Sequence, residues 1–370
     1  MDEVSDVIVR MRDLSIRDSH ISAELELVLS RILESGQFIQ GEEVVKFESL
    51  LSRFVNSPRS ISCASASSGL YLAMKSLEMT VSDEVITTPL SWLVTASAII
   101  LAGATPVFVD VDDNFNIDPQ EVEKAITSKT RAILVVHYYG RVAQIKELQK
   151  IADEHHLVLI EDAAQVFGAE IDGQSVGTFG EIGVFSFSPM KVIGGLGDGG
   201  AVVTRNHYLA DKIEVLRVCG TIDKEFCISP ELKHTMDALH AAFLGKIIPY
   251  TKMLINRRRQ MAMEYQKHLP KEVICPDLGS RFEHTAYDFP VRVSHRDALN
   301  NYLNANGVES RIRHPLLVSN QVVHEHSIKF PMVQAERMVA ETLCLPIHNN
   351  ITIHEILFVC KKISDFYNRT

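Results

Sequence analysis

The chain has 370 residues, 46% of them hydrophobic and 23% charged, which is the composition of an ordinary soluble globular protein with two or three domains. Its formal net charge of −10 argues against nucleic acid or an anionic membrane as the main partner, because both require a basic surface. No apolar run reaches the ~18 residues of a membrane span. Residues 1–14 mix charges and lack the apolar core of a secretory signal.

The six cysteines show no C-x-x-C spacing. This pattern predicts neither a zinc site nor a disulfide framework. We therefore expect a cytoplasmic protein without a bound metal.

Apolar periodicity predicts two helices over residues 20–56, separated by Gly36 and Gly41, and a third over 67–78. Strand and helix patterns then alternate up to residue 162, which is typical of β–α units and a mainly parallel sheet. The expected strands are 84–88, 106–111, 131–137 and 157–162, and the expected helices are 95–103, 119–126 and 145–155.

The second half begins with two strands over 184–187 and 199–204, a helix over 208–218 and a polar, irregular stretch over 221–235. A long helical region follows over 237–269. Its run Arg257, Arg258 and Arg259 predicts a solvated helix face, with nucleotide binding as the alternative. Shorter elements end the chain: strands over 288–293 and 308–315, and helices over 296–307, 333–343 and 353–367. We therefore expect a large domain over 1–250 and a smaller one over 251–370.

Lys191 lies in a glycine-rich loop between the strands 184–187 and 199–204. Glycines let a backbone take positive φ angles and approach a bound group closely. A P-loop is excluded because the glycines follow the lysine, and a G-x-G-x-x-G match ending at Gly200 is accidental because a strand follows it. A lysine placed here either binds phosphate or forms a Schiff base with a carbonyl cofactor. A solvated lysine on a turn is the simpler alternative.

Asp162 follows the continuous apolar run 157–160, which predicts a strand covered on both faces of a parallel sheet. Ligands bind at the carboxyl ends of such strands. An aspartate there, with Gln165 close behind it, suits the ionised partner of a pyridinium N–H, which pyridoxal phosphate (PLP) chemistry combines with a Schiff-base lysine. Taken alone, Asp162 fits the cap of a following helix better.

Residues 63–72, CASASSGLYL, place small hydroxyl side chains before a helical pattern. A helix N-terminus offers free N–H groups and a positive dipole end to a phosphate. An ordinary serine cap is the alternative, and it is compatible with phosphate binding. Ser186, five residues before Lys191, can add a hydroxyl to the same phosphate.

With these three stretches, the chain resembles the DegT/DnrJ/EryC1/StrS aminotransferases, which are PLP-dependent sugar aminotransferases of fold type I. The resemblance covers nearly the whole chain, from GQFIQGEEVVKFE at residue 36 through IEDAAQ and FSFSPMK to CLPIHNNIT at residue 344. It implies an α/β fold, with a large domain built on a mainly parallel seven-stranded sheet between helices and a smaller C-terminal α+β domain. It also implies a homodimer with the active site at the subunit interface.

The resemblance implies a role for each matching residue. Lys191 corresponds to the lysine that carries PLP, Asp162 to the partner of the pyridine nitrogen, and Gln165 to the residue near the phenolic oxygen. The single tryptophan, Trp92, corresponds to the aromatic that stacks on the PLP ring, although a buried core position is the commoner setting for a tryptophan. The residues that correspond to contacts with the cofactor phosphate are Ala66, Ser67 and Ser186.

Two family motifs are altered in this chain. Lys233 stands where the family often has an asparagine that reaches the phosphate of the neighbouring subunit, and Thr235 stands at an arginine of the same motif. A lysine can serve a phosphate as a point charge, so Lys233 is a candidate cofactor contact. The family's H-Y-P near the substrate appears as Arg313, His314 and a proline, which makes Arg313 and His314 candidate substrate contacts.

The implied reaction moves an amino group from glutamate or glutamine to a keto sugar, nucleotide-linked, or to a keto cyclitol. The loop form K-x-x-G-G-x-G-D-G-G resembles members that aminate C3 or a cyclitol. The alternatives are a PLP-dependent sugar dehydratase, in which histidine replaces the lysine, an aminohydroxybenzoate synthase, and a regulatory relative without catalysis. Of the fifteen histidines, His137 is predicted to be structural, with cofactor contact as the alternative, and His155 and His156 are predicted to lie on the surface.

Overall fold

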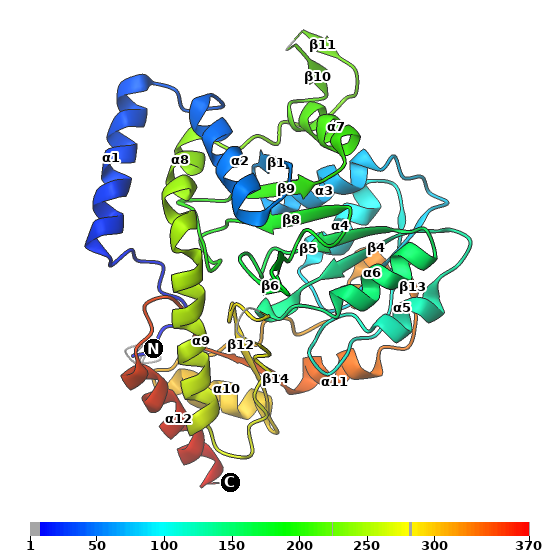
Figure 1. Cartoon of the computed structure of the whole chain (residues 1–370). Helices are drawn as coiled ribbons and strands as arrows, with labels where there is room; N and C mark the ends of the chain where they lie inside the picture. The colour runs from blue at the N-terminus through cyan, green and yellow to red at the C-terminus, as the bar shows by residue number, and fades with distance from the viewer. Residues whose placement is uncertain (1–7, 224, 281–282, 370) are drawn as a thin grey trace.

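An eight-stranded sheet lies at the centre of the computed structural model, within the residues that it describes, 8–223, 225–280 and 283–369. The strand order is β1-β9-β8-β5-β4-β2-β3-β13. Helices cover both faces of this sheet (Figure 1). Residues 1–7, part of the N-terminal stretch that we interpreted as unlike a secretory signal, lie outside the described residues.

The strands of the sheet are β1 (Arg59–Cys63), β2 (Glu84–Thr87), β3 (Thr105–Phe108), β4 (Thr130–Val136), β5 (Val158–Asp162), β8 (Ile182–Ser186), β9 (Gly200–Thr204) and β13 (Ile328–Lys329). The helices around it are α1 (Ser19–Ser35), α2 (Glu42–Val55), α3 (Ala66–Ser76), α4 (Leu93–Leu101), α5 (Pro119–Ala125), α6 (Ile145–Glu154), α7 (His207–Arg217) and α8 (Ala238–Ile247). The C-terminal part contains α9 (Thr251–His268), β12 (Phe289–Arg292), α10 (Arg296–Ala305), α11 (Val333–Glu341), β14 (Thr342–Leu345) and α12 (Ile353–Tyr367). Two small hairpins are β6 (Glu170–Ile171) with β7 (Gln174–Ser175), and β10 (Thr221–Ile222) with β11 (Phe226–Cys227).

The sheet is mainly parallel, which confirms the prediction from the alternating pattern. Strand β9 runs antiparallel to its neighbours β1 and β8, while the remaining neighbours in the described sheet are parallel. Successive side chains of β4 enter different cores: Ile133 and Val135 belong to one hydrophobic cluster, and Ala132 and Leu134 to another. Burial on both faces explains why this strand reads as a continuous apolar run.

The expected strand number of seven is one too low. Seven strands, β1 to β5 with β8 and β9, match the expectation, and β13 adds an eighth at the edge beside β3. Its residues Ile328 and Lys329 come from the C-terminal part and pair with Val107 and Phe108. A strand of two residues is too short to show an alternating pattern, so it could not be predicted from periodicity.

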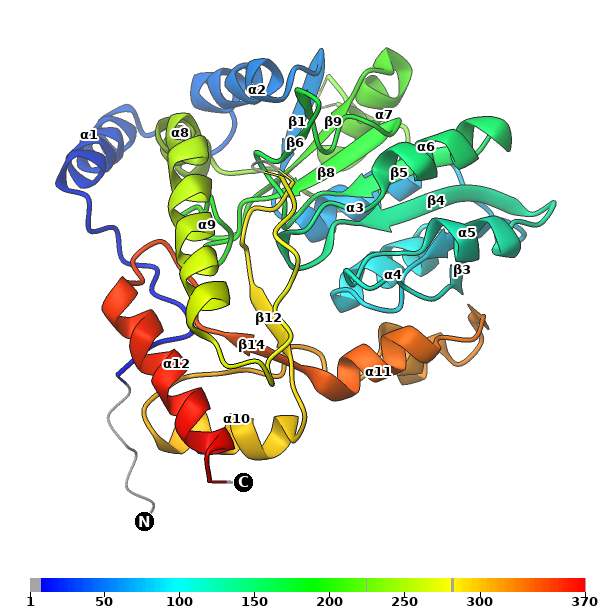
Figure 2. The same ribbon diagram turned by 60° about the horizontal axis from the view of Figure 1, so that its bottom comes forward.

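The C-terminal part has a core of its own, built on the antiparallel pair β12–β14 and packed by α9, α10 and α12 (Figure 2). The N-terminal segment joins this core, because Val9 is buried in it and pairs with Val308. Helix α8 continues through a 3₁₀ turn, Ile248–Tyr250, into α9, and Figure 1 shows the two helices as one long column. The division into domains at residue 250 stays a prediction.

Three local predictions are wrong. Residues 308–315 form no strand; Arg311 makes one isolated bridge with Cys344, and the partner of β12 is β14 instead. The stretch 221–235 contains the β10–β11 hairpin. Arg258 and Arg259 do not face solvent, since both are buried and donate to backbone carbonyl groups, although Arg257 is exposed.

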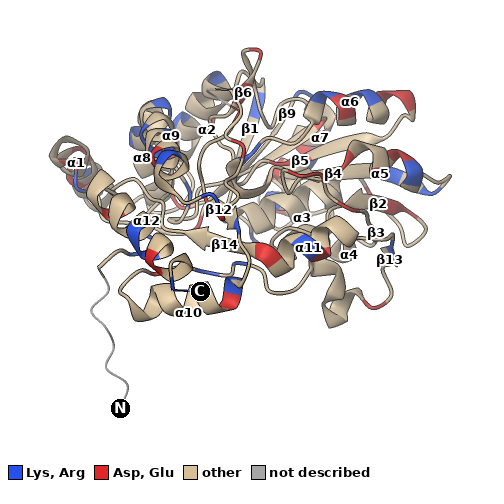
Figure 3. Cartoon of the chain, turned by 90° about the horizontal axis from the view of Figure 1, so that it is seen from below, with Lys and Arg blue, Asp and Glu red and all other residues tan. Residues whose placement is uncertain are grey.

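Charged residues of both signs alternate on the outer helices, and Figure 3 shows blue and red segments mixed on α5 and α6. Ion pairs such as Lys124–Glu121 and Lys150–Glu154 lie on these helices. In the part of the chain that the structure describes, no helix combines the length and the apolar content needed to cross a bilayer. The same residues include no group of three or more His, Cys, Asp or Glu side chains that could hold a metal ion.

Candidate active site

A cavity of about 380 Å³ opens at the carboxyl ends of β5 and β8, and it brings together all but one of the residues predicted for the site. Its volume lies within the range of small-molecule pockets. The predicted residues that line it are Ala66, Ser67, Trp92, Asp162, Gln165, Ser186, Lys191, Arg313 and His314.

Lys191 stands at the centre of the cavity wall, on the loop between β8 and β9. Its backbone N–H donates to the Ser188 carbonyl at 2.9 Å, and its Nζ lies 4.6 Å from the centroid of the Tyr287 ring. A cation over an aromatic face is attracted to it, so the ring holds the lysine in place. The loop is compact, because a Cβ at Gly194 would lie 2.5 Å from the Pro189 carbonyl oxygen. Only glycine fits that approach.

Asp162 ends β5 and is 5% exposed. Its Oδ2 accepts a hydrogen bond from Thr95 Oγ1 at 3.0 Å, and its Oδ1 accepts from the Ala164 N–H at 3.2 Å. Burial raises the pKa of Asp162, and the hydrogen bonds and the charge of Lys191 act in the opposite direction. A cationic ring nitrogen beside the carboxylate would relieve this cost of burial. No helix starts directly after Asp162, so the cap interpretation is wrong.

A cradle of backbone N–H groups, formed by residues 65–67, lies at the start of α3. Ser65 caps this helix and accepts from the Ser68 N–H at 3.1 Å, and Ala66 and Ser67 form its first turn. N–H groups of a first turn have no acceptor within their own helix. Gly200 faces the cradle, and a Cβ there would lie 2.4 Å from the Ser65 carbonyl carbon. With Ser186 at the end of β8, these groups fit the phosphate of PLP.

Gln165 is fixed by its neighbours. Its Oε1 accepts from the Tyr139 N–H at 2.7 Å, and its carbonyl oxygen accepts from Thr285 Oγ1 at 2.8 Å. The side-chain N–H₂ group therefore remains to donate into the cavity. The cavity therefore offers backbone N–H groups to an anion, a lysine to an aldehyde and a carboxylate to a ring nitrogen, with the Gln165 amide beside them. PLP has the corresponding phosphate, aldehyde and pyridine nitrogen.

Trp92 is 59% exposed and lies at the rim of the cavity, so the interpretation as a core aromatic is wrong. Its ring centroid lies 5.8 Å from that of His314 in an edge-on arrangement. Burial, followed by the charge of Arg313, lowers the pKa of His314 to about 4. His314 is therefore a neutral imidazole near pH 7.

A charged wall beside Lys191 was not foreseen from the sequence. Asp288 is buried, and its Oδ1 accepts from Arg313 Nη2 at 3.0 Å and also from Arg12. Burial by itself would raise the pKa of Asp288, but the two guanidinium groups lower it. Arg12 and Arg313 also lie 5.0 Å and 5.8 Å from the centroid of the Tyr287 ring. No spacing in the sequence links these residues, because they come from three distant segments.

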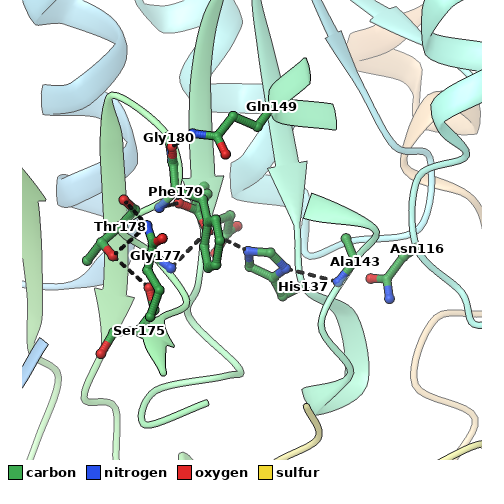
Figure 4. Close-up of polar contacts among 12 residues, drawn as sticks. Asn116, His137, Ala143, Gln149, Ser175, Gly177, Thr178, Phe179 and Gly180 are labelled. Carbon is green, nitrogen blue, oxygen red and sulfur yellow. Dashed lines mark hydrogen bonds and ion pairs between the residues drawn. The ribbon is translucent and has the colours of Figure 1, made fainter. Parts of the chain in front are cut away.

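His137 is a structural residue, as predicted (Figure 4). Its Nδ1 accepts from the Ala143 N–H at 3.1 Å, so Nε2 carries the hydrogen and donates to Glu161 Oε2 at 3.1 Å. Glu161 is fully buried and also accepts from the N–H groups of Gly177, Phe179 and Gly180. This network anchors the end of β5, next to Asp162. His155 and His156 are exposed, which confirms their surface assignment.

Lys233 is the one predicted site residue that does not line the cavity. It is exposed and forms an isolated bridge with Val218, in the segment that follows the β10–β11 hairpin. A role for it in this chain's own cavity therefore has no geometric support.

Comparison with known proteins identifies the family and the fold. The sequence profile of the DegT/DnrJ/EryC1/StrS aminotransferase family matches residues 19–364. The chain belongs to this family. The resemblance drawn from the three motifs is thereby confirmed, and the fold is that of the PLP-dependent aminotransferases of fold type I.

Two relatives from this family match the chain over nearly its whole length. A pleiotropic regulatory protein from Geobacillus stearothermophilus is 34% identical over 97% of this chain and 98% of its own length. A UDP-N-acetyl-3-dehydro-alpha-D-glucosamine 3-aminotransferase from Acidithiobacillus ferrooxidans is 33% identical over 94% and 95%.

Two solved structures of the family superpose closely. DesV from S. venezuelae, in complex with a ketimine intermediate, has a TM-score of 0.93 and 30% sequence identity over 99% of this chain and all of its own. NtdA from Bacillus subtilis, with bound cofactor PMP, has a TM-score of 0.89 and 27% identity over 99% of this chain and 86% of its own. A family member of this fold therefore holds the amine form of PLP.

Proposed function

We propose that this chain is a PLP-dependent aminotransferase that moves an amino group from glutamate or glutamine to a keto sugar. The observation that carries the proposal is that Lys191, the buried carboxylate of Asp162 and the first turn of α3 at Ser67 line one cavity of about 380 Å³. Lysine, carboxylate and phosphate cradle are the three parts that PLP chemistry needs in one place.

Bound in this cavity, PLP supplies an aldehyde that reacts with amines and a ring that accepts electron density. Ala66, Ser67 and Ser186 would hold its phosphate, and Trp92 would contact its ring. Thr95 and the Ala164 N–H donate to the two oxygens of Asp162, and its carboxylate would pair with a protonated ring nitrogen, which would offset the effect of burial on its pKa.

Lys191 has two tasks. Its Nζ would bind the cofactor aldehyde, and as a free amine the same Nζ would be the group that moves a proton during amino transfer. The Tyr287 ring, whose centroid lies 4.6 Å from Lys191 Nζ, would keep this group beside the cofactor, where it would act as a base in its neutral form. Arg313 and His314 line the cavity on the substrate side.

The acceptor is proposed to be a nucleotide-linked keto sugar aminated at C3, with a keto cyclitol as the alternative. The relative from Acidithiobacillus ferrooxidans, 33% identical, is named for 3-amination of a UDP-linked keto sugar, which supports the first choice. The activity is proposed for the cytoplasm, where reduced cysteines and sugar nucleotides occur together.

A second copy of the chain is proposed to complete the site. The β10–β11 hairpin stands away from the body of the molecule (Figure 1), and Phe226, Ile228 and Leu232 on and after it are exposed. Apolar side chains on a projecting hairpin favour a covered interface. Lys233 lies in the same segment, so in a dimer it can reach the partner's cofactor phosphate. A monomer in light scattering that is still active would overturn this part.

A regulatory role without catalysis is the second candidate, because a relative named as a pleiotropic regulatory protein is 34% identical over 97% of the chain. The presence of Lys191, Asp162 and their hydrogen-bond partners favours catalysis. A sugar dehydratase is less favoured, since such relatives carry histidine at the position of Lys191.

An absorbance spectrum of the purified protein tests the proposal. We expect a band near ~420 nm that shifts toward ~330 nm when L-glutamate or L-glutamine is added and is absent in Lys191→Ala. A keto-sugar panel should then restore the first band. A protein that gains no band when PLP is supplied is not an aminotransferase, and a band that no donor shifts favours the regulatory role.

A further inference from the structure

The segment that leads into α4, residues 91–95, reaches the candidate active site at two points. Trp92 caps α4 and lies at the rim of the cavity, and Ser91 lines the same cavity. Thr95, in the first turn of α4, donates a hydrogen bond to Asp162. Both hydroxyl residues are buried, since 2% of Ser91 and 1% of Thr95 is exposed. One short segment therefore contacts both the cavity and the carboxylate that we assign to the ring nitrogen of the cofactor.

The two hydroxyl groups and Asp162 form a chain of hydrogen bonds. Ser91 Oγ lies 2.7 Å from Thr95 Oγ1, which lies 3.0 Å from Asp162 Oδ2. An ionised carboxylate has no hydrogen to donate, so the Thr95 hydroxyl donates to it. Thr95 has only this one hydroxyl hydrogen, so its oxygen accepts from Ser91. While Asp162 is ionised, both hydroxyl hydrogens therefore point along the chain toward the carboxylate.

This chain favours the ionised form of Asp162 over the protonated form. Hydrogen bonds to an ionised group are stronger than those between neutral groups, and in a chain each bond polarises the next. Protonation removes the charge to which Thr95 donates, and both bonds of the chain weaken. The chain therefore opposes burial, which raises the pKa of Asp162.

Besides burial and the Ala164 N–H, two titratable side chains act on Asp162: Lys191, on the loop after β8, and His137, directly after β4. The charge of Lys191 is absent whenever its Nζ serves as a neutral base. His137 already donates its Nε2 hydrogen to Glu161. The hydroxyl chain carries no charge of its own, so it stabilises the carboxylate in every protonation state of the lysine.

We propose that Thr95 and Ser91 are positioning residues that keep Asp162 ionised and so make the cavity selective for an aromatic aldehyde with a protonated ring nitrogen. The inference rests on the proposed function and deepens it. Thr95 acts on Asp162 directly. Ser91 acts through Thr95, because its hydrogen bond fixes the direction in which the Thr95 hydroxyl points.

Absorbance titration of the cofactor-free protein tests Thr95. The two ligands are PLP and an analogue in which a C–H group replaces the ring nitrogen. We expect Thr95→Val to weaken PLP binding on the order of tenfold, because a hydrogen bond to a charged group is lost, and not to weaken binding of the analogue. Thr95→Ser keeps the hydroxyl and should bind PLP like the unaltered protein. If Thr95→Val loses affinity equally for both ligands, Thr95 has only a structural role and the proposal is overturned.

A double-mutant cycle tests Ser91. Ser91→Ala should weaken PLP binding in the unaltered protein, by less than Thr95→Val does, and should cause no further loss in Thr95→Val. An equal loss in both backgrounds would mean that Ser91 acts independently of Thr95, which contradicts the chain. Ser97→Ala is the matched control, because Ser97 is a hydroxyl residue of the same helix that donates to the Leu93 carbonyl and lies outside the cavity. We expect it to bind PLP like the unaltered protein.

The ionisation of Asp162 in the cofactor-free protein separates this inference from the proposed function. NMR of isotope-labelled aspartate carboxyl groups, with Asp162→Asn to assign the signal, follows the protonation of Asp162 as the pH is lowered. We expect a higher pKa for Asp162 in Thr95→Val than in the unaltered protein, because a hydrogen bond to the carboxylate is lost. If the pKa rises but the unaltered protein binds no PLP, the aminotransferase proposal fails and the role of the chain in ionising Asp162 stands. An equal pKa in the two proteins overturns the chain, whether or not PLP binds.

Discussion

Replacing Glu161 with glutamine is expected to destabilise the protein severely, although the two side chains have the same shape. Four N–H groups donate to this buried carboxylate: Oε1 accepts from Phe179 and Gly180, and Oε2 accepts from Gly177 and from His137. Both oxygens must therefore be acceptors. Glutamine can offer an acceptor at only one of the two positions.

The magnitude follows from counting the donors that lose an acceptor. Whichever way the amide is oriented, its N–H₂ group faces two N–H donors. His137 cannot adapt by changing tautomer, because its Nδ1 must keep accepting from the Ala143 N–H. Two buried donors without acceptors cost about 1–3 kcal/mol each. We therefore expect Glu161→Gln to lower the free energy of unfolding by about 2–6 kcal/mol.

Urea denaturation followed by circular dichroism measures this loss as a shift of the midpoint at constant slope. Glu123→Gln is the control, because Glu123 is exposed on α5 and should change stability by less than about 0.5 kcal/mol. If Glu161→Gln is as stable as this control, the hydrogen-bond network does not hold the end of β5, and the reasoning fails.

Three further predictions test other parts of the structure. Asp288→Asn leaves two arginines without their buried counter-charge and should cost about 3–5 kcal/mol in urea denaturation; an unchanged midpoint would contradict this. Gly183→Ala puts a Cβ 1.9 Å from the Gly177 carbonyl oxygen and should lower the melting temperature sharply. Gly245→Ala is the control: a Cβ at this position of helix α8 meets open space, and alanine favours a helix over glycine, so the melting temperature should rise slightly. Burial, followed by the charges of neighbouring arginines, lowers the pKa of His284 to about 3. Below pH ~6.5 the unfolded chain therefore binds a proton at this histidine and the folded chain does not. The free energy of unfolding should fall by up to ~1.4 kcal/mol per pH unit down to pH ~3. This decline should be shallower in His284→Asn, and parallel curves for the two proteins would refute it.

The strands of the large sheet could be predicted because each is marked by its own short stretch of sequence. Apolar runs such as 131–137 and 157–160 mark buried parallel strands wherever they occur, and β4 and β5 are found there. Asp162 and Lys191 were found for the same reason, since each stands at the end of such a strand or on the loop after it. The carboxyl ends of parallel strands lie at the same edge of a sheet, so this prediction does not depend on how the side chains pack.

The charged wall beside Lys191 could not be predicted, because nothing in the local sequence of Arg12, Asp288 or Arg313 indicates that they meet. The burial of Arg258 and Arg259 was missed for a related reason. Apart from Asn349 Oδ1, the hydrogen-bond partners found for them are backbone carbonyl groups of residues 278–287 and 347, which any sequence could provide. A run of three arginines on a helix therefore reads as a solvated face until the surrounding backbone is known.

The pairing of β1 has a consequence for synthesis on the ribosome. This strand is the first of the sheet to be translated, yet its partner is β9, with Arg59 opposite Thr204. Until that partner emerges, β1 and the turn that leads into α3 have no sheet to join, while β2, β3, β4 and β5 can already assemble from neighbouring segments. We expect nascent chains that stop before residue 200 to leave β1 unpaired and sensitive to protease, and chains extended past residue 204 to protect it.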